Sequence, residues 1–345
     1  MRTSPKEIEM PSQERVKRAI RFASPDRMPV MHAILPAVQV KYGTSLNQVL
    51  KPLPDDFGWR PSAELSEKKL PDRFQKGKHY DEFGVLWQVE NAGSYGIPVE
   101  FPLSDWGAYP SYQWPEPVIG YYQIHQYAGE ICNGLKTYAL GGWLSFFERM
   151  QQLRGAENLM MDLAFKTQEV YRLREDLLAY NLRWLDKLLA AQYDGLQFID
   201  DWGAQKSLMI EPQLWRDFFK PVYKTMFEKV KNRGVDVHFH SDGYIMEIIP
   251  DLLDLGVDVL HCQCTIMDAE KLGRDFSGKV CFRTELDSQH ILPFGTPRAV
   301  EKHVRHLFKH LGTSQGGLIA CAEIGPDVPL ENIRAIYQAF MAYAD

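Results

Sequence analysis

The stretch FIDDWGAQKSLMIEPQLWRDFFKPVYKTMFEKVKNRGVDVHFHSDG, residues 198–243, contains a complete strand–helix–strand unit. Between its two β-rich ends, apolar residues recur at every fourth position from Leu214 to Val230, which is the spacing of one buried helix face. Pro212 stands where the first turn of a helix tolerates proline, and Gly234 is a suitable helix stop. The stretch therefore predicts two parallel strands joined by a helix.

The same unit repeats along the chain from about Lys136 onward. Short β-rich runs alternate with amphipathic helical patterns, and the runs are TYALGGW, GLQFIDDW, VDVHFHSDG, VDVLHCQC, KVCFRTELD and GLIACAEIG. Six successive units of this kind predict a parallel sheet with right-handed crossovers. We expect an α/β fold, a closed (β/α)8 TIM barrel. An open doubly wound sheet is the alternative, which is disfavoured because no glycine-rich phosphate-binding motif follows any strand.

The first part of the chain adds a helix, a strand and an irregular region. An amphipathic helix around residues 14–22 precedes RMPVMHAIL, residues 27–35, which is a good first strand. Residues 80–117 contain two strands around a glycine-containing turn, followed by a segment rich in proline and aromatic residues. We therefore predict one barrel domain over residues 1–345, with an N-terminal helix and an insertion that lies over the barrel mouth.

Composition excludes several classes of protein. The net charge is −6 and no long Lys/Arg block occurs, so neither nucleic acid nor an anionic membrane surface is an expected partner. The polar N-terminus has no signal-peptide core, and no apolar stretch is long enough to span a bilayer. Five cysteines, an odd number, indicate reduced thiols and a cytoplasmic location. The oligomeric state stays open, with a homodimer through the apolar GGWLSFFERMQQLRG segment as one option.

Polar side chains gather where five successive predicted strands end. In a (β/α) barrel the C-terminal ends of the strands converge on one mouth, where the chemistry of barrel enzymes takes place. The strand-end residues that could ligate a metal, move a proton or contact a ligand are Asp200, Asp201, Trp202, His240, Asp242, His261, Cys262, Cys264, Arg283, Glu285, Asp287, Cys321 and Glu323. Their convergence predicts a functional site at the mouth.

These residues also have structural explanations. Asp201 could cap the helix that follows it, and Asp242 is a residue that a strand-to-helix turn would use. Arg283 and Glu285 could pair with each other. His238 lies earlier in its strand, so we expect it to pack in the barrel wall with one ring nitrogen bonded to the backbone.

Several segments resemble the uroporphyrinogen decarboxylase-like superfamily. In that family a strand ends in an acidic residue, a helix carries an F-x-x-P pattern and the next strand ends in H-x-x-G. Here the helix pattern is Phe218 and Pro221, and the strand-end pattern is His240 and Gly243. The segments IIPDLLDLGVDVL, PDVPLENIRAIYQAF and ERVKRAIRFASPDRMPV are also similar to segments of that family. The resemblance implies a (β/α)8 barrel.

The superfamily contains decarboxylases and methyltransferases. True uroporphyrinogen decarboxylases open with an arginine-containing segment that holds the substrate's carboxylates, whereas the corresponding MHAILPAVQVKYG has no arginine. The methyltransferases hold zinc with an H-x-C pair and a cysteine on the last strand. His240 matches the histidine, Asp242 replaces the first cysteine, and the second falls at Ala322, beside Cys321. The resemblance therefore implies one zinc or other divalent metal at His240, Asp242 and Cys321, or an acid–base pair instead.

We predict a methyltransferase that moves a methyl group from a small O-, N- or S-methylated substrate to a corrinoid protein or a thiol. Because the substrate loses its methyl group, the enzyme is also a demethylase. The corrinoid is expected only on a separate partner protein. The predicted catalytic residues are Asp201, His240, Asp242 and Glu323, and the predicted substrate-binding residues are Trp202, Arg283, Glu285 and Trp106. Two alternatives stay open: a decarboxylase of a porphyrinogen or a smaller acid, and a barrel that binds a small ligand without turnover.

Overall fold

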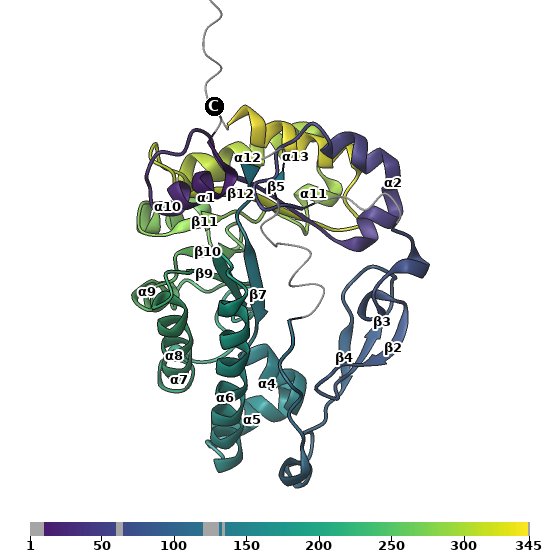
Figure 1. Cartoon of the computed structure of the whole chain (residues 1–345), viewed down its shortest axis with the longest axis vertical. Coiled ribbons are helices and arrows are strands. Elements are labelled where there is room, and N and C mark those ends of the chain that lie inside the picture. The colour runs from purple at the N-terminus through teal and green to yellow at the C-terminus, as the bar shows by residue number, and fades with distance from the viewer. Residues whose placement is uncertain (1–9, 60–64, 120–130, 133–134, 344–345) are drawn as a thin grey trace, which may run out of the picture.

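Seven parallel strands form one curved sheet in the computed structural model, which describes residues 10–59, 65–119, 131–132 and 135–343. The spatial order is β1-β12-β11-β10-β9-β8-β7, so strands that follow one another in the barrel repeat are neighbours. Their bounds are β1 Val30–Ile34, β7 Leu140–Leu144, β8 Gly195–Ile199, β9 Asp236–Ser241, β10 Val259–Cys262, β11 Cys281–Arg283 and β12 Leu318–Ile324. Helices lie around this sheet (Figure 1). The predicted α/β barrel architecture is confirmed.

Asp56 bridges the two edge strands of the sheet. Its backbone N–H donates to the carbonyl of Val30 in β1 at 2.8 Å, and its carbonyl accepts from the N–H of Tyr138, just before β7, at 2.9 Å. The segment around Asp56 therefore occupies the place of an eighth strand, although it is too irregular to form one. Bridging both edges leaves neither of them open for pairing at this position.

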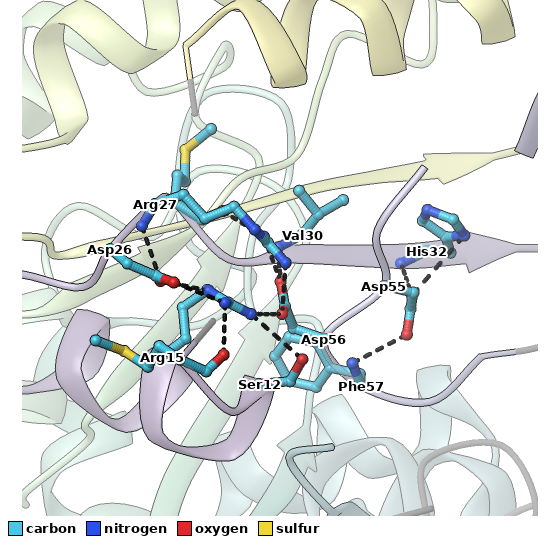
Figure 2. Close-up of polar contacts among 11 residues, drawn as sticks. Ser12, Arg15, Asp26, Arg27, Val30, His32, Asp55, Asp56 and Phe57 are labelled. Carbon is cyan, nitrogen blue, oxygen red and sulfur yellow. Dashed lines mark hydrogen bonds and ion pairs between the residues drawn. The ribbon is translucent and has the colours of Figure 1, made fainter. Parts of the chain in front are cut away.

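The Asp56 carboxylate is the centre of a buried ion-pair network (Figure 2). Arg15 in α1 donates to its Oδ1 at 2.7 Å, and Arg27 donates to both oxygens at 2.8 and 3.0 Å. The N–H of Val30 donates to Oδ2 at 2.8 Å, and Arg15 reaches Asp26 with two further hydrogen bonds. Asp56 is fully buried and Arg15 is 1% exposed. The network ties the N-terminal helix to the point where the barrel closes.

The helices follow the strands in the order that the repeat predicts. Their bounds are α1 Ser12–Ile20, α2 Pro36–Leu50, α4 Phe147–Arg154, α5 Ala156–Phe165, α6 Gln168–Ala190, α7 Pro212–Phe218, α8 Lys220–Lys231, α9 Ile249–Asp254, α10 Ala269–Phe276, α11 Ile291–Phe294, α12 Pro297–Leu311 and α13 Leu330–Ala342. Within the part of the chain that the structure describes, no helix combines the length and the apolarity that crossing a bilayer requires.

The predicted helix from Pro212 to Val230 is two helices, α7 and α8, which meet at Phe219. Pro221 explains the division, because a proline inside a helix removes one backbone N–H and its ring clashes with the carbonyl four residues earlier. At the start of α8 the same ring is tolerated. The apolar spacing continues through the break, so both helices still bury the same face: Phe218 in α7 and Val222, Met226 and Val230 in α8 are buried.

The insertion predicted around residues 80–117 contains a three-stranded antiparallel sheet. Its strands are β2 Gly77–Tyr80, β3 Leu86–Val89 and β4 Ile97–Glu100, in the order β2-β3-β4, so it has one strand more than predicted. The small sheet is separate from the barrel sheet (Figure 1). A short 3₁₀ helix, Trp106–Ser111, follows it and is capped by the side chain of Asp105. Short elements also occur at Glu67–Lys69, Asp72–Phe74, Ile131–Cys132 and Leu135–Lys136.

His238 fills the barrel interior below the site. It is fully buried, and its Nε2 lies 2.9 Å from the hydroxyl of Tyr138. Tyr138 donates its one proton to Asp236 Oδ2 at 2.9 Å, so His238 Nε2–H must be the donor to Tyr138. A Cβ on the facing Gly195 would clash with the Tyr138 hydroxyl and the His238 ring, which explains the glycine there. The burial agrees with the expected packing role. The expectation that a ring nitrogen bonds to the backbone is wrong, because the partner of Nε2 is the Tyr138 hydroxyl.

We predict that His238→Ala lowers the free energy of unfolding by about 1–3 kcal/mol without abolishing activity. The substitution opens a gap in the packed interior and leaves the Tyr138 hydroxyl without its donor. Chemical denaturation monitored by circular dichroism would measure the loss, with His238→Gln, which keeps an N–H donor, as the matched control. Equal stability of the alanine variant and the unmodified chain would contradict a packing role.

Candidate functional site

A cavity of about 370 Å³ opens at the C-terminal end of the barrel, and every strand of the barrel sheet, or the residues just after it, contributes to its wall. Trp87 and Tyr95 of the insertion also line it, as the prediction of an insertion over the mouth requires. The lining residues are Met31, Ala33, Trp87, Tyr95, Trp143, Glu148, Gln152, Gln197, Ile199, Asp201, His240, Asp242, His261, Arg283, Cys321 and Glu323. The cavity therefore combines aromatic rings, acids, two imidazoles and one guanidinium.

Three buried side chains at the cavity form a hydrogen-bonded chain. His240 in β9 pairs in register with His261 in β10, and their Nδ1 atoms are 2.7 Å apart. Arg283 in β11 pairs in register with His261 and places its Nη2 2.7 Å from the same His261 Nδ1. Its Nη1 donates to Gln197 Oε1 at 3.1 Å. Each of the three neighbouring strands supplies one of these side chains, so the pairing of the strands fixes their relative positions.

The direction of these hydrogen bonds fixes the proton on each imidazole. A guanidinium only donates, so His261 Nδ1 must accept and carries no proton. His261 Nδ1 shares its one lone pair between Arg283 and His240, because two unprotonated ring nitrogens 2.7 Å apart would repel each other, and the His240 proton is therefore on Nδ1. Burial lowers the pKa of His240 to about 4, against the opposing effect of Asp201 and with a smaller contribution from Arg283. The ring is therefore neutral at pH 7, and its Nε2 carries a lone pair.

The lone pair of His240 Nε2 faces two carboxylates. Asp201 Oδ1 lies 3.6 Å from it and Asp242 Oδ1 lies 3.4 Å from it. The backbone N–H of Asp242 donates to Asp201 Oδ1 at 2.8 Å, which holds the two acids together. Asp242 Oδ1 is enclosed and has no hydrogen-bond partner among the described residues. A lone pair and two carboxylates repel one another unless a cation or a proton lies between them.

Two groups of side chains bring ligand atoms within 4.8 Å of one another: Asp201 with His240 and Asp242, and His240 with His261 and Glu285. In the second group His261 Nε2 lies 3.7 Å from Glu285 Oε2. Because His261 Nδ1 accepts from Arg283, its Nε2 carries the proton of the neutral ring and points a donor toward this acid. A metal there would have to displace that proton, so the first group is the better cation site.

Further acids surround the two aspartates. Burial and the charges of Asp201 and Asp200 raise the pKa of Glu148 well above its usual range, and Glu148 shares a hydrogen bond with Asp201. Burial, Asp201 and Glu323 raise the pKa of Asp242 to about 7, and it shares a hydrogen bond with Glu285. The pKa values of Glu285 and Glu323 are also raised, chiefly by burial. Several carboxyl groups here keep their protons near neutral pH.

Asp200, the other acid at the end of β8, has a structural role. It is fully buried, and its carboxylate accepts hydrogen bonds from the backbone N–H groups of Phe146 and Glu148 and from the hydroxyl of Tyr223. It therefore fixes the start of α4, which in turn places Glu148 at the cavity. Sequence reasoning missed Glu148, although it follows the end of a predicted strand.

Most of the predicted site residues come together. Those that line the cavity are Asp201, His240, Asp242, Arg283, Cys321 and Glu323, and Glu285 lies beside Asp242 and His261. Cys321 belongs to neither ligand group, and burial raises the pKa of its thiol to about 12. The roles assigned to these residues stay predictions.

Trp202 and Trp106 are not among the residues that line the cavity. Trp202 is fully buried behind the site, where it stacks on Phe147 with ring centroids 4.0 Å apart. Neighbouring residues of an extended chain point to opposite sides, so when Asp201 faces the cavity, Trp202 faces away. Trp106 donates its Nε1–H to Asp162 at 3.3 Å. The aromatic lining comes instead from residues that the sequence did not single out.

Residues 136–343, more than half of the chain, match the family model described as uroporphyrinogen decarboxylase (URO-D). The chain belongs to this family. The resemblance predicted from the sequence is therefore confirmed. A search of curated proteins found no significant match.

Among solved structures, a methyltransferase from Methanosarcina mazei aligns with a TM-score of 0.65 and 14% identity over 98% of this chain and 100% of that one. A dihydropteroate synthetase (TM-score 0.30, 12% identity, 42% and 55% of the chains) also matches. So does a B12-independent methionine synthase from Shewanella sp. W3-18-1 (TM-score 0.30, 16% identity, 50% and 54%). At 14% identity the first match shows a shared fold, and the other two carry no argument.

Proposed function

We propose that this chain is a methyltransferase of the uroporphyrinogen decarboxylase family. It would move a methyl group from a small O-, N- or S-methylated compound to a thiol or to a corrinoid carried by a separate protein. The observation that supports this most strongly is the His240 centre, where one imidazole lone pair and two carboxylates face a cavity. The full-length structural match to a methyltransferase agrees with this proposal at the level of the fold.

The donor set suits a divalent cation. His240 Nε2, Asp201 and Asp242 would hold the ion, because their ligand atoms lie close together and Asp242 Oδ1 has no hydrogen-bond partner among the described residues. One nitrogen and two carboxylates are acceptable to zinc and to harder ions such as Mn²⁺. When bound, such an ion would act as a Lewis acid toward an oxygen or sulfur atom of the donor or acceptor.

The chain's own side chains would perform the remaining tasks. Arg283 holds His261, and His261 holds His240 with its Nε2 toward the cavity. When a methyl ether is cleaved, the electron pair of the broken bond stays on oxygen, which then needs a proton. Glu148 lines the cavity and keeps its proton near neutral pH, so it can supply that proton.

We predict that protein purified without a chelator contains about one divalent metal ion per chain. Elemental analysis by mass spectrometry would measure it, and Asp242→Asn should lower the content because it removes one negatively charged ligand. Glu331→Gln, on the exposed first turn of α13, is a matched control that should leave the content unchanged. A chain that takes up no stoichiometric divalent ion would rule out the metal and leave His240 and Asp242 as an acid–base pair.

The affinity for the metal should also depend on pH. The pKa of Asp242 is about 7 before an ion binds, so a proton occupies this ligand below that pH and must be released for binding. The apparent affinity should therefore weaken as the pH falls through 7. Titration with zinc at several pH values would show whether it does.

Methyl transfer itself can be tested with ¹³C-methyl-labelled donors. Labelled methyl ethers, amines and sulfides would be incubated with the protein and either a thiol or a reduced corrinoid protein, and NMR would follow the label. Label that moves to an acceptor supports the proposal. Ligand-induced thermal stabilisation without any movement of label would favour a barrel that only binds its ligand.

Family membership makes decarboxylation the second candidate. Arg283 lines the cavity and could hold one carboxylate, with a protonated acid such as Glu148 to protonate the resulting carbanion. A porphyrinogen carries many carboxylates, but Arg283 is the one Lys or Arg side chain among the described lining residues. Incubation with uroporphyrinogen, with loss of carboxyl groups followed by mass spectrometry, would decide between the two functions.

A further inference from the structure

The cavity pairs aromatic rings with acids. Trp87 and Tyr95 of the insertion and Trp143 of β7 form the aromatic part of its lining. The acidic part consists of Asp201, Asp242 and Glu323, with Glu148, which keeps its proton near neutral pH, beside them. A positively charged ligand gains from both, because the face of an aromatic ring and a carboxylate each attract a cation.

The one guanidinium in the described lining does not reverse this preference. Arg283 directs Nη2 to His261 Nδ1 and Nη1 to Gln197 Oε1, so these nitrogens are engaged by neutral acceptors in the cavity wall. Without a metal ion, Asp201, Asp242 and Glu323 outnumber this one guanidinium. With a divalent ion in the Asp201, His240 and Asp242 group, Glu323 still balances Arg283, and the aromatic rings carry the preference for a cation.

Trp143 is held at the cavity by an unusual backbone. Its φ is +97°, in the region where residues other than glycine are rare, and Gly142 before it has a φ of +98°. The pairing of β7 with β8 shifts its register between Gly142 and Leu144, as in a β-bulge, which re-aims a side chain. A tryptophan in this conformation is strained, and such strain is found where function requires it. The strain keeps an indole ring in the wall.

We infer that the cavity binds a small methylated cation, a quaternary ammonium or a sulfonium compound. The inference rests on the proposed function, because it names the methyl donor for the same transfer. The bond from the methyl carbon to nitrogen or sulfur would break with its electron pair on that atom, which leaves a neutral amine or sulfide. The electron pair of a thiolate or a reduced corrinoid would form the new bond to carbon. No proton is needed for this leaving group.

A pair of ligands that differ in charge alone tests the inference. Choline and 3,3-dimethylbutan-1-ol have the same shape, but a carbon atom replaces the nitrogen in the alcohol. Isothermal titration calorimetry of the purified full chain should show choline binding at least about tenfold more tightly than the alcohol. Equal affinities, or tighter binding of the alcohol, would overturn the inference.

Variants of the wall should change only the affinity for the cation. Trp143→Leu should weaken choline binding by about fivefold or more and leave the alcohol's affinity unchanged, whereas Trp143→Phe should keep most of the affinity. Glu323→Gln, which keeps the size of the side chain, should also weaken choline binding and serves if Trp143→Leu fails to fold. If Glu323→Gln and Trp143→Leu both bind choline as the unmodified chain does, the wall does not recognise the cation.

The same reagents separate this inference from the proposed function. Selective binding of choline without transfer of its ¹³C-labelled methyl group to a thiol or a corrinoid would support the cation site and count against the methyltransferase. Transfer from a neutral methyl ether, with no affinity for choline, would support the methyltransferase and overturn the cation site.

Discussion

His240→Ala is expected to lower methyl transfer, or the affinity for a divalent metal, by about ten- to a hundredfold or more in a protein that remains folded. The substitution removes the lone pair that faces Asp201 and Asp242. It also removes the donor to His261 Nδ1, but that atom keeps its hydrogen bond from Arg283. His261 and Arg283 should therefore stay in place. Activity assays, metal titration and circular dichroism on one preparation would measure all three quantities.

His238→Ala is the natural control, because it removes the same side chain two positions earlier on the same strand. His238 is hydrogen-bonded to Tyr138 in the barrel interior and is not among the residues that line the cavity. We expect His238→Ala to lower the stability of the protein and to leave its activity unchanged, which is the reverse of the effect expected for His240→Ala. Full activity of His240→Ala together with an inactive but folded His238→Ala would mean that the chemistry belongs to the other histidine.

The barrel could be predicted because its signals are local. The repeat of β-rich runs and helical spacing lies within short windows of sequence, and parallel strands bring their C-terminal ends to one mouth. The grouping of Asp201, His240, Asp242 and Glu323 around one cavity follows from that rule alone. Their chemical roles do not follow from it, since capping and ligation use the same residue types.

What could not be predicted depends on contacts between distant segments. The edge-bridging segment around Asp56 reads DDFGW, which has no apolar alternation, and its backbone pairs on both sides only because β1 and β7 need a partner. Trp87 and Tyr95 reach the cavity from an insertion whose position above the mouth is a tertiary feature. The sequence also does not reveal which side of the chain Trp202 takes.

The hydrogen-bond directions that place the lone pair on His240 required coordinates as well. They depend on the register that sets His240 beside His261 and His261 beside Arg283. Each pairing joins residues about twenty positions apart in the chain. From the sequence alone, His261 was one strand-end residue among many, and its part in orienting His240 was invisible.

Asp56→Ala is expected to lower the free energy of unfolding by about 3–5 kcal/mol, the largest loss of stability that we predict. Asp56 neutralises Arg15 and Arg27 in a place where Arg15 is 1% exposed. Removing it leaves Arg15 with Asp26, which already accepts two hydrogen bonds from it, and takes from Arg27 the carboxylate with which it forms an ion pair. Thermal and denaturant unfolding would measure the loss.

Glu14→Ala is the matched control for this experiment. Glu14 pairs with Arg18 on the same helix, but both side chains are nearly half exposed, so water replaces the lost partner at little cost. Its stability should match that of the unmodified chain within the error of the measurement. The Val30 N–H, which donates to Asp56 Oδ2, gives a second readout, because its hydrogen exchange should accelerate when the carboxylate is removed. If Asp56→Ala were as stable as Glu14→Ala, the barrel would have to close through the backbone contacts of residue 56 alone, and the buried network would be a consequence of closure instead of its cause.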